Sequence, residues 1–560
     1  MPVTDPGREG TDAASVTDAP DAAPHSTIGR ASAFLASGTL VSRLLGFVSA
    51  IVLASAISIN GGAGDAFALA NQLPNNIYSL IAGGLLSAVI VPQIVKANLH
   101  SDGGAAFINR VITIGLVVFV VVTAVATACA PLLVRLYGGG FNESELALAT
   151  GFAYWCLPQI FFYALYSLIG ETLNARGVFG PFTWAPVLNN IVVIGSLALF
   201  IALFGGASEH GVAGSWTPTQ IALVGGGATL GIVVQAVALF FFLGRAGLRY
   251  RPDFRWRGAG LGSTGRAASW VFAMFLVTQV SGVVEANVAS SATGEASINA
   301  MKYGWLMFML PHSIATVSIV TAYFTRMSSH VRDGRLGQLR DDLSAALRSS
   351  LLIIVFSGVG LGVLAYPFSA VFGQSYAEVS SLAVVYLGYL TGLVPFTVFF
   401  VLLRVFYALD RTRAAFVIQV AQTAFYVGGA LLVGAVVPLE SVAVALALVL
   451  SAAIVFQGLL SAIYLRRVLG PLDTARVVRR TLWFAAAALP AGAAGWGILT
   501  LLGGVSEGAY PVDGRPGAIV TMLLAGTVMA IVYGAVLWMT RNPELRAIGE
   551  PLLARLRRTR

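Results

Sequence analysis

The sequence predicts an all-α polytopic membrane protein with fourteen transmembrane helices, arranged as two pseudo-symmetric six-helix lobes plus two C-terminal helices. Composition gives the class: 57% of the 560 residues are hydrophobic and 11% are charged, which excludes an ordinary soluble domain. The number of apolar runs gives the number of helices, and a repeat within the chain gives the two lobes.

Each apolar run is long enough, at about 20 residues, to form a helix that crosses a lipid bilayer. In chain order the runs start near 32, 66, 107, 146, 180, 218, 268, 297, 342, 378, 413, 440, 479 and 516.

The loops between these runs alternate in charge. Seven loops contain no Lys or Arg, among them 206–216 and 504–514, whereas the intervening loops carry basic runs such as "YLRRVLGPLDTARVVRR". The positive-inside rule then places both termini in the cytoplasm. Arg135 and Arg515 lie close to loops of the first kind and are exceptions. Topology and contact with anionic membrane lipids explain the net charge of +9, so no nucleic-acid partner is expected.

An internal repeat predicts the two lobes. "NQLPNNIYSL" at 71–80 matches "FMLPHSIATV" at 308–317, with an offset of 237 between Pro74 and Pro311. Six predicted spans separate the copies, and this even number gives both lobes the same orientation in the membrane. Residues 1–30 are expected to be a disordered tail without a cleavable signal peptide. The predicted units are then the tail 1–30, an N-lobe 31–247, a basic linker 248–267, a C-lobe 268–468, a two-helix addition 469–541 and a basic cytoplasmic tail 542–560.

Polar side chains inside the predicted spans are the candidate binding residues. Arg43 lies about twelve residues into the first span, near the membrane midplane, where a charge costs about 2.5–3.5 kcal/mol on insertion scales. In the second span Asp65, Gln72 and Asn75 belong to a polar helical face. Such a face is typical of the wall of a water-filled cavity.

The second half of the chain supplies further candidates: Glu285 in the seventh span, and Lys302 and His312 in the eighth. The repeat offset carries Asp65 onto Lys302, so the two lobes place opposite charges at equivalent positions. Structural ion pairs and interhelical hydrogen bonds are the alternative interpretation. For the charged residues we favour a substrate or ion pathway, because charges at this depth usually mark one.

The sequence contains no nucleotide-binding motif, no His and Cys cluster with metal-ligand spacing, and no nucleophile with a nearby base. An enzyme is therefore not expected, and neither is a cofactor. The energy for transport would come from an ion gradient, with sodium or protons as the candidates, from the membrane potential or from removal of the product.

"SRLLGF", "DAFALANQLPNNIYSLIAGGLLSAVIVPQIVKA" and "FYALDRTR" resemble the corresponding segments of the MurJ/MviN lipid II flippases, in the multidrug/oligosaccharidyl-lipid/polysaccharide exporter superfamily. The resemblance covers about 31–540. It implies alternating access in a bacterial plasma membrane, moving an undecaprenyl-pyrophosphate-linked peptidoglycan precursor from the inner to the outer leaflet for cell-wall synthesis. It also implies that residues 469–541 line a groove for the lipid tail.

The chain departs from the family pattern at several basic positions. It has Ser49, Ala50, Tyr78 and Leu306 where family members carry charged residues, and Lys302, one turn before Leu306, would supply a cation. A flippase for another undecaprenyl-linked glycan and a cation-coupled multidrug antiporter of the same superfamily are therefore kept as alternatives. A non-transporting membrane scaffold is disfavoured, because it would not need charges matched across two repeats.

Two further expectations concern charge. The resemblance implies a sodium site that includes Glu285 and Asp410, although Asp410 is equally suited to cap a helix or to pair with Arg411. Arg43 is expected to alternate between Asp65 in the resting cavity and the substrate pyrophosphate in the loaded one, because a guanidinium forms paired hydrogen bonds with either anion.

Overall fold

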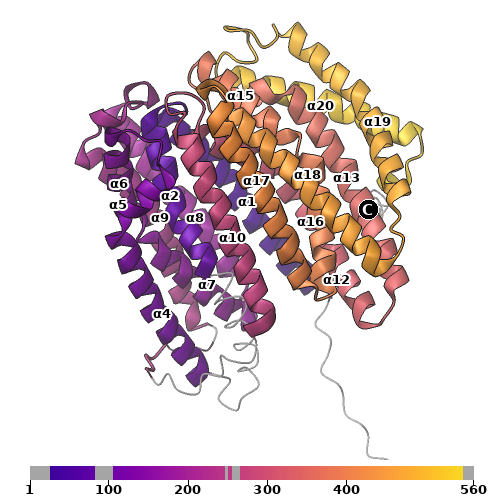
Figure 1. Cartoon of the computed structure of the whole chain (residues 1–560), viewed down its shortest axis with the longest axis horizontal. Helices are drawn as coiled ribbons and strands as arrows, with labels where there is room; N and C mark the ends of the chain where they lie inside the picture. Colours follow the sequence, from indigo (N-terminus) through magenta and orange to yellow (C-terminus); the bar gives the residue numbers. More distant parts are fainter. Residues whose placement is uncertain (1–24, 82–104, 246, 248–249, 255–264, 547–560) are drawn as a thin grey trace, which may run out of the picture.

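The computed structural model describes residues 25–81, 105–245, 247, 250–254 and 265–546 (Figure 1). In this part of the chain, twelve helices are long and apolar enough to cross a membrane, or thirteen if the bent pair α15 (Tyr376–Leu390) and α16 (Leu393–Ala408) is one span. The predicted all-α polytopic class is confirmed. The second predicted span begins as α2 (Gly62–Ile81) and continues outside the described residues, so the count of fourteen stays a prediction.

Helices from the first half of the chain pack on one another and form the N-lobe, in indigo to magenta in Figure 1. Within it α1 packs on α8, α8 on α9, α2 on α6, and α4 on α7. Its helices are α1 (His25–Ala56), α2, α4 (Ala105–Ala128), α5 (Ala130–Tyr137), α6 (Glu143–Cys156), α7 (Gln159–Ala175), α8 (Gly180–Phe204) and α9 (Pro218–Leu243).

The C-lobe is built in the same way from the next helices, with α10 packed on α17, α17 on α18, and α11 on α15. Its helices are α10 (Gly265–Ser290), α11 (Ile298–Pro311), α12 (Val317–Arg332), α13 (Leu336–Val363), α14 (Ala365–Ala370), α15, α16, α17 (Thr412–Val436) and α18 (Val442–Leu469).

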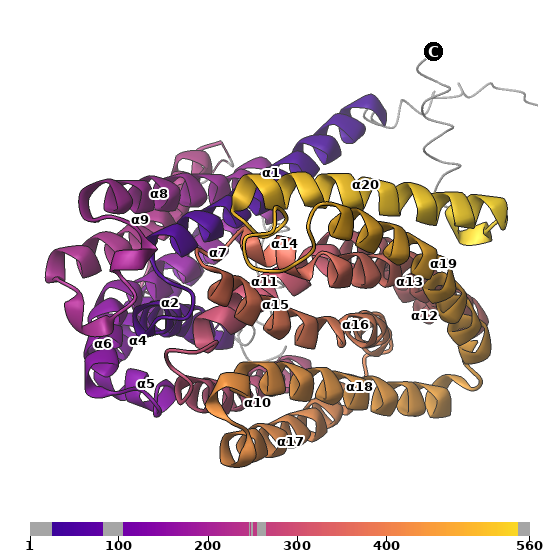
Figure 2. The ribbon, with the colours of Figure 1, turned by 90° about the horizontal axis from the view of Figure 1, so that it is seen from above.

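The last two helices lie along one flank of the C-lobe, as Figure 2 shows. α19 (Thr474–Leu501) packs on α13, and α20 (Arg515–Met539) packs on α19 and α14. The start of α20 lies beside α1, the first helix of the N-lobe (Figure 2). Through the start of α20, this helix pair therefore contacts the N-lobe as well as the C-lobe.

Local sequence explains several helix boundaries. Asn142 accepts a hydrogen bond from the Glu145 backbone N–H, and the Glu145 carboxylate accepts one from the Asn142 N–H, a reciprocal cap that starts α6. Pro311 ends the α-helical hydrogen-bond pattern of α11, and a π-helical turn over 312–316 connects α11 to α12. Proline has no N–H to donate, so a local change of helix type at this point is expected.

Three predicted boundaries change. α1 begins at His25, so the last six residues of the predicted tail 1–30 are helical rather than disordered; residues 1–24 lie outside the described part. The linker 248–267 ends earlier than predicted, since α10 begins at Gly265. The C-terminal tail 542–560 begins as ordered chain, because Asn542 and Glu544 are buried.

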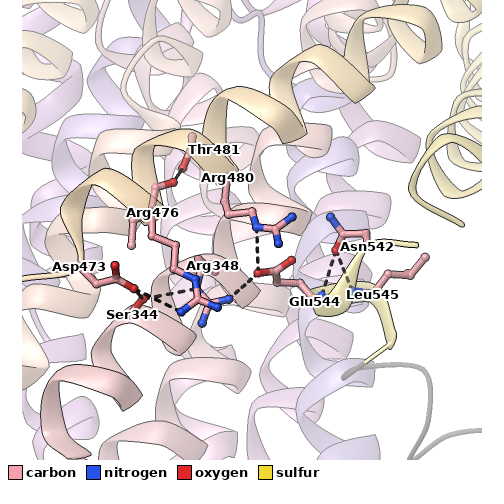
Figure 3. Close-up of polar contacts among 10 residues, drawn as sticks. Ser344, Arg348, Asp473, Arg476, Arg480, Thr481, Asn542, Glu544 and Leu545 are labelled. Atoms are coloured by element: carbon pink, nitrogen blue, oxygen red, sulfur yellow. Dashed lines mark hydrogen bonds and ion pairs between the residues drawn. The ribbon is translucent and has the colours of Figure 1, made fainter. Parts of the chain in front are cut away.

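A cluster of charged side chains holds this C-terminal segment (Figure 3). The Glu544 carboxylate pairs with Arg348 of α13 at 2.5 Å and with Arg480 of α19 at 3.7 Å. Nearby, the Ser344 hydroxyl donates to Asp473 at 2.7 Å. The cluster fixes α13, α19 and the chain after α20 to one another.

The two ends of the bundle differ in loop charge. We call one the arginine-free end, because its loops, at 57–61, 138–142, 205–217, 291–297, 371–375, 437–441 and 502–514, contain no Lys or Arg. The opposite end, with the turns at 333–335, 409–411 and 470–473, is the arginine-rich end.

Candidate transport cavity and lobe interface

A cavity of about 380 Å³ lies between the two lobes. α2 of the N-lobe supplies Gln72 and Asn76, α10 supplies Gln279 and Glu285, and α11 supplies Lys302. On each helix the lining positions recur every three to four residues, which places them on one face. The sequence-predicted residues that the structure brings together here are thus Gln72, Glu285 and Lys302.

Among the described residues, one cation and one carboxylate line the cavity. Lys302 and Glu285 both line it, and neither forms an ion pair with a residue of the described chain. The Lys302 ammonium lies 5.6 Å from the centre of the Phe67 ring, a distance at which the ring face attracts a cation. Within the described residues, a charged ligand in the cavity would therefore find neither charge paired with a counter-ion.

Arg43 does not line this cavity. Its side chain is exposed in the middle of α1, where the helix packs on α8 and the neighbouring Ser42 carbonyl accepts a hydrogen bond from Asn190 at 3.0 Å. Thirteen residues separate Arg43 from Ala56 at the end of α1, a rise of about 20 Å. Arg43 therefore lies far below the arginine-free end.

Asp65 lies at the arginine-free end, and its hydrogen-bond partners differ from the expected partner, Arg43. Its side chain is fully buried, and its carboxylate accepts hydrogen bonds from the Ser297 hydroxyl and, at 2.7 Å, from the Asn299 backbone N–H. Ser297 immediately precedes α11, so an N-lobe carboxylate satisfies the free N–H groups at the start of a C-lobe helix. The expected pairing of Arg43 with Asp65 is wrong in this conformation, because helix length separates the two.

Glu378 provides the reciprocal contact. This buried residue of α15 accepts hydrogen bonds from the Ser58 hydroxyl at 2.6 Å and from the Ile59 N–H at 3.1 Å, both from the N-lobe. Asn60 donates to the hydroxyl of Ser381 in the same helix at 2.9 Å. Each lobe thus contributes a buried carboxylate that accepts from neutral donors of the other.

The turn between α5 and α6 makes a third contact. The Gly139 N–H donates to the Asn287 amide oxygen at 3.1 Å, and the Gly140 N–H donates to the Ser290 hydroxyl at 2.9 Å. A Cβ atom on Gly140 would lie 2.5 Å from the backbone nitrogen of Ser291, so only glycine allows this approach. The sequence signal was the run "YGGGFN", which the sequence analysis left unused.

The other predicted site residues lie elsewhere. His312 is buried between the rings of Phe396 and Phe400, at 4.6 and 4.8 Å between ring centres. Asn75 is exposed on α2, and its neighbour Asn76 lines the cavity instead.

Asp410 lies in the turn before α17, in a pocket that it shares with Trp270. Trp270 and Glu285 are both on α10, fifteen residues apart, a rise of about 22 Å. The expected pairing of Glu285 with Asp410 in one cation site is therefore wrong. In the described part of the chain, His, Cys, Asp and Glu side chains form no group of three that could hold a metal ion.

Comparison with known proteins identifies the family. The family model described as "Lipid II flippase MurJ" matches residues 56–508, which is most of the chain. The chain belongs to the lipid II flippase MurJ family. It is 28% identical over 353 residues to the probable lipid II flippase MurJ of Haemophilus influenzae, which covers 59% of this chain and 65% of the relative. It is 26% identical over 525 residues to that of Vibrio cholerae, covering 87% and 93%.

Solved structures agree on the fold of this MurJ family member. A lipid II flippase MurJ in an inward closed conformation superimposes with a TM-score of 0.69 at 18% identity, covering 91% of this chain and 99% of that one. An inward-facing multidrug resistance transporter of the MATE family gives a TM-score of 0.60 at 16% identity, covering 77% and 96%. The fold of this chain is thus shared with both of these solved structures.

Proposed function

We propose that this protein moves lipid II, an undecaprenyl-pyrophosphate-linked peptidoglycan precursor, from the inner to the outer leaflet of the bacterial plasma membrane by alternating access. The observation that carries the proposal is the inter-lobe cavity lined by Lys302, which forms no ion pair within the described residues, in a chain that belongs to the MurJ family. A pyrophosphate needs a cation held away from bulk water, and Lys302 meets that need.

The orientation follows from loop charge. The positive-inside rule places the arginine-free end outside the cell and both termini in the cytoplasm. In that orientation the hydrogen bonds of Asp65 and Glu378 close the cavity from the outside. The conformation is thus one that would receive its cargo from the cytoplasmic leaflet.

The cavity must widen to take this cargo. Its volume of about 380 Å³ lies at the lower end of the range for drug-sized ligands, and a disaccharide with a pentapeptide is larger. Arg43, exposed on α1 between the cavity level and the arginine-rich end, would meet the pyrophosphate as the lobes part. The prenyl chain would stay in lipid, along the flank formed by α19 and α20.

Cation coupling would act through Glu285. Its carboxylate lines the cavity without an ion-pair partner in the described chain, and sodium or a proton would neutralise it. The same carboxylate favours the alternative of a cation-coupled multidrug antiporter, because an acidic cavity attracts cationic drugs. Efflux of a cationic dye by cells that express the protein would support that alternative.

The test is complementation of a bacterium depleted of its lipid II flippase, with translocation of labelled lipid II measured in the same cells. The wild type is expected to restore growth and flipping. Lys302→Gln should lower flipping about tenfold, and Lys302→Arg should retain more of it. Arg43→Lys should lose most flipping and Arg43→Ala nearly all, because an ammonium cannot form paired hydrogen bonds. Arg135→Gln is the matched control, since Arg135 is exposed and does not line the cavity.

Failure of the wild type to restore lipid II flipping, at normal abundance in the membrane, would refute the proposal. Efflux of the cationic dye without flipping of lipid II would favour the alternative function of a cation-coupled multidrug antiporter.

A further inference from the structure

Arg515, like Arg135, is an exception among the basic residues, because it lies at the arginine-free end as the first residue of α20. Positive charge on that side is disfavoured by the rule that orients membrane proteins. Its contacts explain why the position nonetheless holds an arginine.

The guanidinium of Arg515 joins three helices from different parts of the chain. Its Nη2 donates to the hydroxyl of Ser55 in α1, and its Nε donates to the carbonyl of Val371, just after α14, at 3.0 Å. The Ser55 hydroxyl in turn donates to the Ile51 carbonyl at 2.8 Å. The C-terminal helix pair is therefore tied directly to the first helix of the N-lobe.

These two bonds require the geometry of arginine. A guanidinium presents N–H groups in a rigid planar fork and can reach two acceptors at once, whereas an ammonium is a compact charge on a flexible stem. Two nearby carboxylates, Glu507 and Asp513, line the same pocket of about 540 Å³ as Arg515. Neither forms an ion pair with Arg515 in the described chain, so the guanidinium bridges helices instead of neutralising its neighbours.

The surroundings of Ser55 make α1 the element that this bridge controls. One turn or more before Ser55, the Phe47 ring packs on Phe368 and Phe372, with ring centres 5.7 and 5.1 Å apart. Tyr303 donates to the Ala50 carbonyl at 3.4 Å. The second half of α1 thus packs against the C-lobe. Arg515 adds a contact close to the C-terminal end of α1, at Ser55.

We propose that Arg515 is a positioning residue for transport, which ties the C-terminal helix pair to α1 while the arginine-free end is closed and releases α1 when that end opens. Glu507 and Asp513, in the same pocket, are the partners that the released guanidinium would take. This inference rests on the alternating access of the proposed function, and it gives the added helices a part in closing the cavity.

The test measures access to the closed interface from outside the cell. Cys129 and Cys156 are replaced by Ala, and Ala292→Cys provides a reporter at a position that is 1% exposed, in an apolar cluster that includes Ala54 and Ile59 of the N-lobe. An impermeant maleimide is applied to intact cells. Arg515→Ala should raise the labelling rate about tenfold, because a hydrogen-bonded charge is lost from the closed state alone. Arg515→Lys should raise it less, and Ser55→Ala should raise it in the same direction.

Two controls separate this role from misfolding. Arg135→Ala removes the other basic residue close to the arginine-free loops and should leave labelling unchanged. The double variant Arg515→Ala with Ser55→Ala should label no faster than Arg515→Ala alone, because both remove one interaction. Membrane abundance of each variant is measured in parallel. Unchanged labelling in Arg515→Ala, or fully additive effects in the double variant, would overturn the inference.

The readout does not depend on the cargo. If Arg515→Ala opens the interface but the wild type flips no lipid II, the inferred role of Arg515 is supported and the proposed function is refuted. If the wild type flips lipid II and Arg515→Ala changes neither labelling nor flipping, the bridge fails and the proposed function stands.

Discussion

At the arginine-free end, the hydrogen bonds of Asp65 and Glu378 cross from one lobe to the other. At the arginine-rich end, the ion pairs of Arg348 with Glu544 and of Arg326 with Asp342 stay within the C-lobe and its added helices. The crossing contacts join a carboxylate to neutral donors, and the contacts within a lobe join a carboxylate to a cation.

This difference fits what each end has to do in an alternating-access cycle. Contacts between lobes must break and re-form in every cycle, and a charged-to-neutral hydrogen bond contributes roughly 1.5–3 kcal/mol. Separating a buried ion pair costs more, because it leaves charge without a partner. Ion pairs are therefore suited to joining elements that move together, and neutral donors to a closure that must open.

The largest effect is expected from Asp65→Asn, because this change alters one of the two carboxylates whose hydrogen bonds join the lobes at the arginine-free end. The amide keeps one oxygen, which can accept from only one of the two donors, Ser297 and Asn299, and its NH2 group faces the other. This mismatch, together with the lost charge, should weaken the closed state by roughly 3 kcal/mol. Maleimide labelling of Ala292→Cys should then rise about a hundredfold, with precursor binding retained. Glu440→Gln, which changes an exposed acid at the same end, is the control. Slow labelling in Asp65→Asn would show that this carboxylate does not hold the lobes together.

Glu544→Gln tests the opposite end. It leaves Arg348 and Arg480 without their shared carboxylate, and should lower stability by about 2 kcal/mol, since both arginines keep some contact with water. Thermal unfolding of the purified protein measures this loss. Labelling at Ala292→Cys should stay at the wild-type rate, and a rise would mean that the two ends are coupled more closely than their contacts indicate.

A smaller effect is expected from Gly140→Ala at the α5–α6 turn. The new methyl group would meet the backbone of Ser291 and push the turn from the end of α10, weakening closure by about 1–2 kcal/mol. Labelling should rise several-fold. Gly195→Ala is the matched control, because a Cβ there meets nothing within 4 Å. Equal labelling in the two variants would contradict this account of the turn.

The smallest effect is expected from Asp333→Asn in the exposed turn at the arginine-rich end. A hydrogen bond from Arg335 lowers the pKa of Asp333 below its usual 3.8, so any stabilisation is present above that pH and is lost as the pH falls through the lowered value. The pair is exposed and screened by water. Thermal unfolding between pH 5 and pH 8 should match the wild type, and a clear difference would show that this turn contributes to stability.

Sequence periodicity predicted much of the fold and part of the cavity. Apolar runs located the helices because a bilayer demands a fixed length of apolar chain, and helical spacing placed Gln72, Glu285 and Lys302 on faces that meet. The expected pairing of Arg43 with Asp65 was wrong, because residue spacing identifies the polar face of each helix but not the depth in the bundle at which two faces meet. Sequence periodicity missed Glu378 and Arg515, whose partners Ser58 and Ser55 lie hundreds of residues away with no periodic signal.

The closure at the arginine-free end has a consequence for antibacterial chemistry. In the proposed orientation, a compound designed to compete with cargo in the cavity would first have to cross the membrane, because the hydrogen bonds of Asp65 and Glu378 close the arginine-free end. The pocket of about 540 Å³ around Arg515 and Asp513 lies at the arginine-free end and has the size of a small-ligand site. In the proposed orientation, a molecule bound there that keeps Arg515 on Ser55 of α1 would act on the protein without entering the cytoplasm.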